Sequence, residues 1–285
     1  MLSLLILLST VGYCGTVTDE AGRLVAVPEY CKRIVSLAPS ITEILFALGA
    51  GNRVVGVSQF SNYPVQARKV AKVGSYVYPN LERIVALQPD LVIGTRDGNP
   101  KVLVERLSEL GIPVFVTDPK NLEEITVTVT NIGRVIGAEE AASSLARQMT
   151  RRIHQVEARV CGEPRPKVFF QIGIEPVISA GRGTFIDVLI RKAGGLNIAA
   201  SSSGYPRFNI ERVLVAQPQV IIITSMARGF SFEKAKQFWQ QWPQIPAVKH
   251  KLIYPIDSDI CDRPSPRIVD GLETLARIIH PERFP

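Results

Sequence analysis

Short apolar runs alternate with amphipathic segments along most of the chain. The runs expected to be buried strands are 33–38, 54–57, 91–93, 114–116, 167–172, 220–224 and 252–255. They lack the every-second-residue polarity of a half-exposed sheet, which is typical of parallel strands covered on both faces. The segments with helical apolar spacing are 42–48, 81–87, 102–110, 122–136, 185–193, 210–216, 232–241 and 266–279. The alternation predicts an α/β fold with parallel sheets and helices on both of their faces.

One segment interrupts this alternation. Residues 138–161 contain neither Gly nor Pro, and their apolar residues recur at helical spacing. They predict a helix about 36 Å long at about 1.5 Å per residue. We therefore expect an N-terminal lobe over 16–137, a linking helix over 138–161 and a C-terminal lobe over 162–285.

Two stretches of sixteen residues repeat each other. Residues 80–95 read NLERIVALQPDLVIGT and residues 209–224 read NIERVLVAQPQVIIIT, with seven identical positions. Each stretch predicts a helix, a break at Gln-Pro and a buried strand. The helix dipole favours Glu in any first turn, but it does not account for Asn-x-Glu-Arg and Gln-Pro recurring in register. The repeat favours a duplicated lobe.

The N-terminus has the features of a secretory signal. In MLSLLILLSTVGYCG the apolar run from Leu2 to Leu8 is too short to span a bilayer, and small and polar residues follow it. We expect residues 1–15 to be a signal peptide and the protein to be exported. Cys14 stands where a lipoprotein signal places its acylated cysteine, so a lipid anchor there is the alternative to a soluble form. Residues 16–28, polar with turn residues, are expected to form an N-terminal extension.

Charge and cysteine content bear on nucleic-acid binding and on disulfide bonds. The chain has 285 residues, 46% of them hydrophobic, and its net charge of +7 is scattered without a run of five like charges. This pattern argues against nucleic acid as a partner. If Cys14 is removed or acylated, Cys31, Cys161 and Cys261 remain, and the simplest count is one disulfide plus one free thiol, with the pairing open.

The usual catalytic and metal-binding motifs are missing from the sequence. There is no HExxH, no Walker A motif, no GxSxG and no EF-hand loop. His154, His250 and His280 are scattered, which argues against a catalytic triad and against a zinc site. The sequence therefore predicts a protein that is not an enzyme and that has neither a cofactor nor a metal site.

Loops rich in aromatic residues and proline follow several of the predicted strands. Phe60 lies in the loop after 54–57, and Tyr76 and Tyr205 each precede the Glu of their repeat copy by six residues. Ligands of open α/β sheets bind outside the carboxyl ends of the strands. Two aromatic side chains facing each other there would clamp a large flat ligand and leave an OH group free to hydrogen-bond.

Several longer motifs carry a family resemblance. They are RIVSLAPSITE at 33–43, GVSQFSNYP at 56–64, NLERIVALQPD at 80–90, the long helix and DRPSPR at 262–267. Together they resemble the periplasmic substrate-binding proteins of ABC importers that have a rigid helix between their lobes, and the resemblance runs from about Val17 to the end. That class serves cobalamin, haem and ferric siderophores. The FSNYP loop, the NLERI run and the segment from Asp259 to Arg267 are most similar to the cobalamin-binding type.

The resemblance implies a fold and a ligand site. The fold is two Rossmann-like lobes with parallel sheets joined by a single long α-helix. Phe60, Tyr76 and Tyr205 would hold a corrin ring between the lobes, with Asp259 and Arg263 as polar contacts. Tyr76 and Tyr205 stand where tryptophans can occur, and a third aromatic is replaced by Thr95, so a precursor such as cobinamide or another macrocycle stays open.

The resemblance also implies a partner. One surface Glu on each lobe, Glu82 and Glu211, would dock onto the permease of an ABC importer, a complex of permease and ATPase in the inner membrane. The receptor itself would act as a periplasmic monomer. One alternative is a haem or ferric-siderophore receptor of the same fold, with Tyr76, Tyr205 or Arg263 as iron ligand or carboxylate clamp. Another is an enzyme or chelatase with related lobes, which would need a histidine in these loops.

Overall fold

The computed structural model describes residues 13–224 and 232–284, which form two compact units. Of the described residues, those up to Asp118 and Thr128–Leu145 belong to unit 1, and Pro119–Val127 and those from Ala146 onward belong to unit 2. The predicted linking helix is present as α5 (Glu139–Val160). The boundary between the units at Leu145 falls inside α5, and the boundary at Val127 falls inside the preceding helix α4 (Leu122–Val135).

Unit 1 is built on a parallel sheet with the strand order β5-β4-β3-β6-β7. Its strands are β3 (Ile34–Ser36), β4 (Val54–Val57), β5 (Ala71–Lys72), β6 (Leu91–Thr95) and β7 (Val114–Thr117). Every residue of β3, β6 and β7 is buried, which explains why these runs show no polar alternation. The helices are α1 (Pro39–Ala47), α2 (Leu81–Ala86) and α3 (Lys101–Glu109), with short 3₁₀ turns at Gly51–Arg53 and Val65–Lys69.

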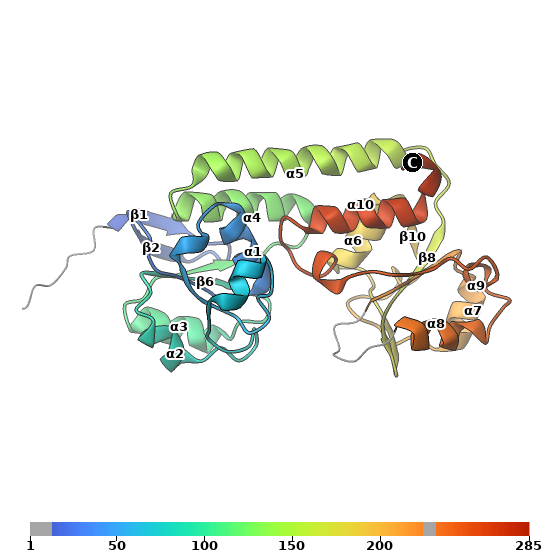
Figure 1. Cartoon of the computed structure of the whole chain (residues 1–285), viewed down its shortest axis with the longest axis horizontal. Helices are drawn as coiled ribbons and strands as arrows, with labels where there is room; N and C mark the ends of the chain where they lie inside the picture. Colours follow the sequence, from blue (N-terminus) through green and yellow to red (C-terminus); the bar gives the residue numbers. More distant parts are fainter. Residues whose placement is uncertain (1–12, 225–231, 285) are drawn as a thin grey trace, which may run out of the picture. The chain divides into compact units, whose positions relative to one another are not determined.

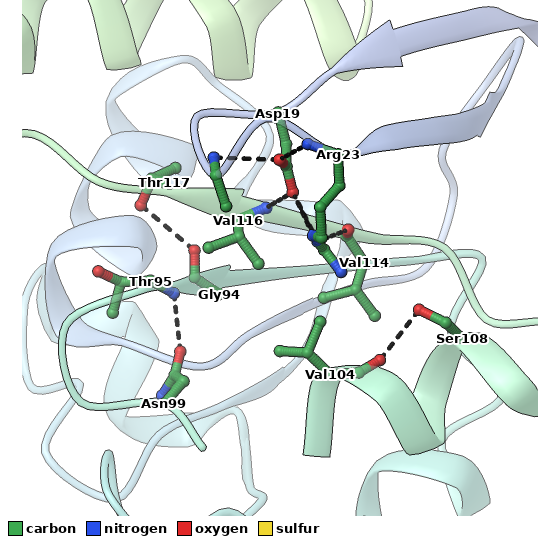
Figure 2. A network of polar contacts seen from close by, with 11 residues as sticks. Asp19, Arg23, Gly94, Thr95, Asn99, Val104, Ser108, Val114, Val116 and Thr117 are labelled. Atoms are coloured by element: carbon green, nitrogen blue, oxygen red, sulfur yellow. Dashed lines mark hydrogen bonds and ion pairs between the residues drawn. The ribbon is translucent and has the colours of Figure 1, made fainter. Parts of the chain in front are cut away.

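The predicted polar extension at 16–28 is wrong, because this segment belongs to an antiparallel hairpin of β1 (Tyr13–Thr18) and β2 (Leu24–Pro28). Asp19 holds the hairpin turn in place. Its buried carboxylate accepts the backbone N–H groups of Arg23 at 2.8 Å and of Val116 on β7 at 3.2 Å, and also the guanidinium of Arg23 (Figure 2). Of the predicted signal peptide, residues 1–12 lie outside the described residues.

Unit 2 has the strand order β10-β8-β11-β12, with β9 paired to β8. Its strands are β8 (Lys167–Ile174), β9 (Val177–Ser179), β10 (Leu196–Asn197), β11 (Val220–Ile223) and β12 (Ile253–Pro255). Its helices are α6 (Phe185–Lys192), α7 (Ile210–Ala216), α8 (Phe232–Gln240), α9 (Pro246–Lys249) and α10 (Ile268–Ile279), with 3₁₀ turns at Ser258–Ile260 and Pro281–Arg283. The strands predicted in this unit are parallel, as expected, and β9, which is not among the predicted strands, folds back antiparallel along β8.

The two units repeat one topology. Without β5 and β9, the strand orders are β4-β3-β6-β7 and β10-β8-β11-β12. If the four strands of each sheet are numbered along the chain, both orders are 2-1-3-4. α1 and α6 each follow the first strand of this order along the chain, and α2 and α7 each precede the third. The topology supports the duplicated lobe that the sequence repeat indicated.

The apolar face of α5 packs as its spacing predicts. Met149, Ile153 and Val156 are buried, and α4 lies beside α5 with Gly133 against Ala142 (Figure 1). A Cβ at residue 133 would come within 2.2 Å of the Ala142 Cβ, so the close approach of these helices needs glycine there. Within the described residues, no helix combines the length and the apolar character that crossing a membrane requires.

Candidate functional site

Most of the repeated stretch has a local structural explanation. The side-chain oxygens of Asn80 and Asn209 cap α2 and α7 by accepting the backbone N–H of the Arg three residues later, at 2.7 and 3.0 Å. After each helix, Gln88 and Gln217 adopt left-handed backbone conformations with φ of 45° and 50°. The following prolines are buried in both copies. The Asn cap and the Gln-Pro break therefore recur because both units start and stop the same short helix in the same way.

The repeated Glu has no comparable packing role. Glu82 and Glu211 are exposed in the first turns of α2 and α7, whereas Ile84 and Val213, two residues further on, are fully buried. Each helix thus packs its apolar side on its own unit and leaves the Glu in solvent. The docking role of these two residues stays a prediction.

Phe60 lies in the loop that follows β4, and 47% of its surface is exposed. A chain of buried hydroxyl groups fixes this loop beneath it: Ser36 to Thr42 at 2.8 Å, Thr42 to Ser61 at 2.8 Å and Ser61 to Ser58 at 2.9 Å. The chain runs from β3 through α1 to the loop, so the position of Phe60 is set by the core of unit 1.

Tyr76 is braced by the loop that follows β6. Its OH donates to the carbonyl of Asp97, and its own carbonyl accepts the Asn99 amide at 2.7 Å. Gly98, with φ of +97°, lies directly under the ring, where a side chain would overlap it. The Asn99 side chain also accepts the backbone N–H of Thr95 at 2.8 Å, which fixes the brace to the end of β6 (Figure 2). The OH expected to be free for a ligand is thus already engaged.

Tyr205 lies in the loop between β10 and α7, and 56% of its surface is exposed. The loop runs beside the β9 region, where Arg182 donates its backbone N–H to Ser202 at 2.7 Å and Phe208 donates to Val177 at 2.9 Å. Its main chain is therefore ordered although the Tyr205 side chain faces solvent.

Asp259 and Arg263 form an ion pair in the segment that follows β12. Arg263 Nη2 lies 2.5 Å from Asp259 Oδ1, and the two side chains are only 14% and 24% exposed, respectively. Both carboxyl oxygens of the nearby Asp262 are buried and have no hydrogen-bond partner among the described residues. Burial, followed by the negative charge of Asp259, raises the pKa of Asp262 to about 7. The segment thus combines an ion pair with a carboxyl that titrates near neutrality.

All five predicted ligand residues follow the carboxyl ends of parallel strands, as expected for an α/β site. Phe60 and Tyr76 follow the neighbouring strands β4 and β5 in unit 1, whereas Tyr205 and the Asp259–Arg263 pair follow β10 and β12 at opposite ends of the unit 2 order. Their roles stay predictions. The sequence did not indicate that Asn99 supports Tyr76 or that the Asp262 carboxyl is buried without a hydrogen-bond partner among the described residues. Both facts depend on contacts between residues, which the residue type alone does not reveal.

Other features of the described residues bear on chemistry. Cys31, Cys161 and Cys261 are free thiols, so the expected disulfide among them is wrong. Burial raises the pKa of Cys31 to about 12, which keeps that thiol protonated. A cavity of about 560 Å³ in unit 2, lined among others by Cys161 and Lys192, contains none of the predicted ligand residues.

The three histidines lie in exposed or packed positions. His154 and His250 are exposed, and His280 packs against the carbonyl of Gly194 at 3.3 Å, as expected for solvated or packed residues. In the part of the chain that the structure describes, no three His, Cys, Asp or Glu side chains are grouped to hold a metal ion.

Comparisons with known proteins identify the family of the chain and agree with its α/β fold. The family model described as periplasmic binding protein matches residues 34–260. The vitamin B12-binding protein of Vibrio cholerae is 32% identical over 256 residues, which cover 88% of this chain and 90% of the relative. The crystal structure of a periplasmic vitamin B12-binding protein of Vibrio cholerae matches with a TM-score of 0.79 and 30% identity, over 90% of this chain and 99% of that one.

Two further similarities extend the comparison. An uncharacterized ABC transporter substrate-binding lipoprotein of Bacillus subtilis is 31% identical over 276 residues, which cover 94% of this chain and 86% of the relative. A periplasmic heme-binding protein from Roseiflexus, solved in its apo form, matches with a TM-score of 0.79 and 27% identity, over 88% of this chain and 99% of that one. These relatives are binding proteins.

Proposed function

The chain belongs to the periplasmic binding protein family, and from that premise we propose that it is an exported receptor that binds a corrinoid and delivers it to an ABC importer. The observation that carries the proposal is the 32% identity to a vitamin B12-binding protein over 90% of that protein's length. The proposed cargo is cobalamin or a related corrinoid, and the protein carries it without a catalytic step.

The loops at the carboxyl edges of the two sheets supply suitable contacts. Phe60 and Tyr205 expose about half of their surfaces, and Tyr76 is held in place before any ligand arrives. Aromatic faces bury much apolar area at a low cost in side-chain entropy, which suits a large macrocycle. Asp259 and Arg263 offer an acceptor and donors to the amide groups on the rim of a corrin ring, provided that their ion pair opens or is bridged.

Calorimetric titration of the mature protein with cyanocobalamin tests the ligand. We expect binding with a dissociation constant below about 1 µM, and the double variant Tyr76→Ala, Tyr205→Ala should bind about 100-fold more weakly, because two stacking surfaces are lost. Absence of binding at tens of micromolar would exclude cobalamin as the ligand.

Reversal of charge at both Glu82 and Glu211 tests the partner. Transport should be lost while affinity for the ligand stays within about 1 kcal/mol, because exposed rim charges orient partners more than they bind ligand. The matched control is Glu105→Lys with Glu233→Lys, which reverses two exposed helix charges in the same two units and should leave transport intact. A collapse of ligand affinity in the first variant would place Glu82 and Glu211 in the ligand site.

A second candidate, which the comparisons favour less, is a haem receptor of the same fold. The heme-binding protein from Roseiflexus matches as well in TM-score as the vitamin B12-binding protein does. Tyr205, which exposes 56% of its surface in the loop before α7, is the phenolate that we propose as the iron ligand in that case. A haem titration followed by absorbance separates the candidates. An iron–phenolate band that appears in the wild-type protein and is lost in Tyr205→Phe would favour haem.

We also propose that the protein works as a monomer, either soluble in the periplasm or anchored by a lipid at Cys14. The lipoprotein relative of Bacillus subtilis supports the anchor. Radiolabelled palmitate should enter the wild-type protein and not Cys14→Ala if the anchor is present. Equal labelling of both proteins would contradict an anchor at this cysteine.

A further inference from the structure

Arg212, the second residue of the repeated Glu-Arg pair on α7, turns back onto the loop that precedes its own helix. Its Nη2 atom lies 3.0 Å from the hydroxyl oxygens of both Ser201 and Ser202. Its guanidinium carbon lies 4.1 Å from the centroid of the Phe208 ring. All three contacts fall within residues 201–208, the loop that carries Tyr205.

We propose that Arg212 is a positioning residue that holds the 201–208 loop against α7 and thereby fixes Tyr205 for the ligand. The role of Tyr205 rests on the proposed function, whereas the ordering of the loop does not. In the unit 2 copy of the Glu-Arg pair, Glu211 then faces solvent and Arg212 fixes the loop.

The chemistry of arginine suits this position. A guanidinium is planar, so it donates hydrogen bonds in its plane and stacks on an aromatic ring with its face at the same time. Phe208 is held in place for stacking, because it is only 6% exposed and packs in the core of unit 2. The centroid of its ring lies 5.5 Å from that of the Phe169 ring. Lysine keeps the charge but lacks the planar fork, so it cannot make both kinds of contact.

Main-chain hydrogen bonds join the loop to residues 181 and 182. Gly204 donates its backbone N–H to Arg182 at 3.0 Å and accepts that of Gly181 at 2.7 Å. A Cβ at residue 181 would come within 2.2 Å of the Ser202 carbonyl oxygen, so glycine permits this approach. Because these bonds do not involve Arg212, its loss should loosen the side of the loop that faces α7 without unfolding the unit.

The equivalent arginine in unit 1 provides a matched control. Arg83 makes one long contact, 3.5 Å from Nη1 to the carbonyl of Lys72. Tyr76 is held instead by Asp97 and Asn99. Arg83→Ala therefore removes the same residue from the same repeat position and should leave the loop before α2 largely unchanged.

Hydrogen exchange and calorimetry of the mature, ligand-free protein test the role of Arg212. In Arg212→Ala, exchange of peptides covering 201–208 should rise about tenfold, whereas in Arg83→Ala exchange over 72–80 should change less than about twofold. Affinity for cyanocobalamin should fall about tenfold in Arg212→Ala and by an intermediate factor in Arg212→Lys. The midpoint of thermal unfolding should move little in all three variants.

Two results would overturn the proposal: unchanged exchange over 201–208 in Arg212→Ala, or faster exchange with an unchanged affinity. If the wild-type protein does not bind cyanocobalamin, the proposed function fails, and the exchange data alone decide whether Arg212 orders the loop. If Arg212→Ala does not fold, the double variant Ser201→Ala, Ser202→Ala removes the two hydroxyl partners of Arg212 outside the core and is measured in the same way.

Discussion

The two copies of the repeated stretch, 80–95 in unit 1 and 209–224 in unit 2, share their local structure and differ in what surrounds them. Each has an Asn cap, an exposed Glu in the first helical turn and a left-handed Gln before a buried Pro. The Asn cap and the left-handed Gln satisfy the main-chain groups at the two ends of a short helix. They recur because any copy of the unit needs them, whatever its loops bind, whereas the exposed Glu has no such structural role.

The difference lies at the carboxyl edge of each sheet. In unit 1, Asn99 links Tyr76, the end of β6 and the carbonyl of Leu37 with one buried side chain. In unit 2, the Thr224 hydroxyl and the Asp262 carboxyl are buried and lack hydrogen-bond partners among the described residues. Since an unpaired buried polar group costs about 1–3 kcal/mol, these groups should lower the stability of the unit 2 edge. The two copies therefore share their helix and strand, whereas different side chains line the carboxyl edge of each sheet.

The largest expected effect comes from removing the unit 1 brace. Asn99→Ala should lower the free energy of unfolding by about 3 kcal/mol, because several backbone groups lose their partner in a buried site. Affinity for cyanocobalamin should fall about tenfold as Tyr76 loses its support. Urea unfolding and calorimetry measure the two quantities.

Asn197→Ala is the matched change in unit 2. This buried Asn also has three hydrogen-bond partners, Ala180, Asp187 and Ala199, none of which is a predicted ligand residue. It should lose similar stability while its affinity changes less than about twofold. Equal losses of affinity in both variants would mean that general destabilisation, rather than the brace on Tyr76, sets the affinity.

Gly98→Ala should have the next largest effect. Its φ of +97° strains any side chain, and the new methyl group would meet the Tyr76 ring, so we expect a loss of about 2 kcal/mol together with displacement of the ring. Gly204→Ala in the Tyr205 loop has a φ of +64° and open space around it, so it should lose only about 1 kcal/mol. Thermal unfolding of both variants tests the comparison, and equal losses would show that the ring contact adds nothing.

The pH dependence of stability distinguishes the two edges. The folded-state pKa of Asp262, about 7, exceeds its ordinary value of 3.8, so the folded state holds this proton more tightly than the unfolded state. The contribution of Asp262 is therefore full below about pH 4 and is lost as the pH rises through about 7. Asp262→Asn stays neutral, so at pH 8 it should be more stable than wild type by about 1–3 kcal/mol, with no gain at pH 4.

Urea unfolding at both pH values measures this change, and Asp19→Asn is the counterpart in unit 1. The Asp19 carboxylate is hydrogen-bonded to Arg23 and to the backbone of β7, so its replacement should destabilise the protein at pH 8. A gain in stability for Asp19→Asn, or none for Asp262→Asn at pH 8, would contradict the contrast between satisfied and unsatisfied carboxyls.

The smallest expected effect concerns the feature that the copies share. Gln88→Gly and Gln217→Gly should each stabilise the protein by about 0.5–1 kcal/mol, because glycine adopts left-handed conformations without strain. The gain should be smaller at Gln217, since its side chain also donates to the carbonyl of Leu214 at 2.6 Å. Thermal unfolding tests the order, and a larger gain at Gln217 would contradict it.

The strands and helices could be predicted from the sequence because their patterns are local. Fully buried strands such as β6 appear as unbroken apolar runs, and α5 lies within one residue of its predicted ends. The hairpin β1–β2 could not, since Leu24–Pro28 alternates over only five residues and Asp19 finds its partners on β7, nearly a hundred positions later. The short strands β5, β9 and β10 carry too few residues for any pattern.

The sequence by itself determined the α/β architecture, the duplication and the loops in which ligand residues are sought, because periodicity and a repeated motif depend on neighbours in the chain. Only the tertiary structure decided what those side chains do. It engaged the OH of Tyr76, paired Asp259 with Arg263 and turned Arg212 onto the Tyr205 loop. The physical reason is that a polar side chain takes its role from the donors and acceptors around it, and folding chooses those.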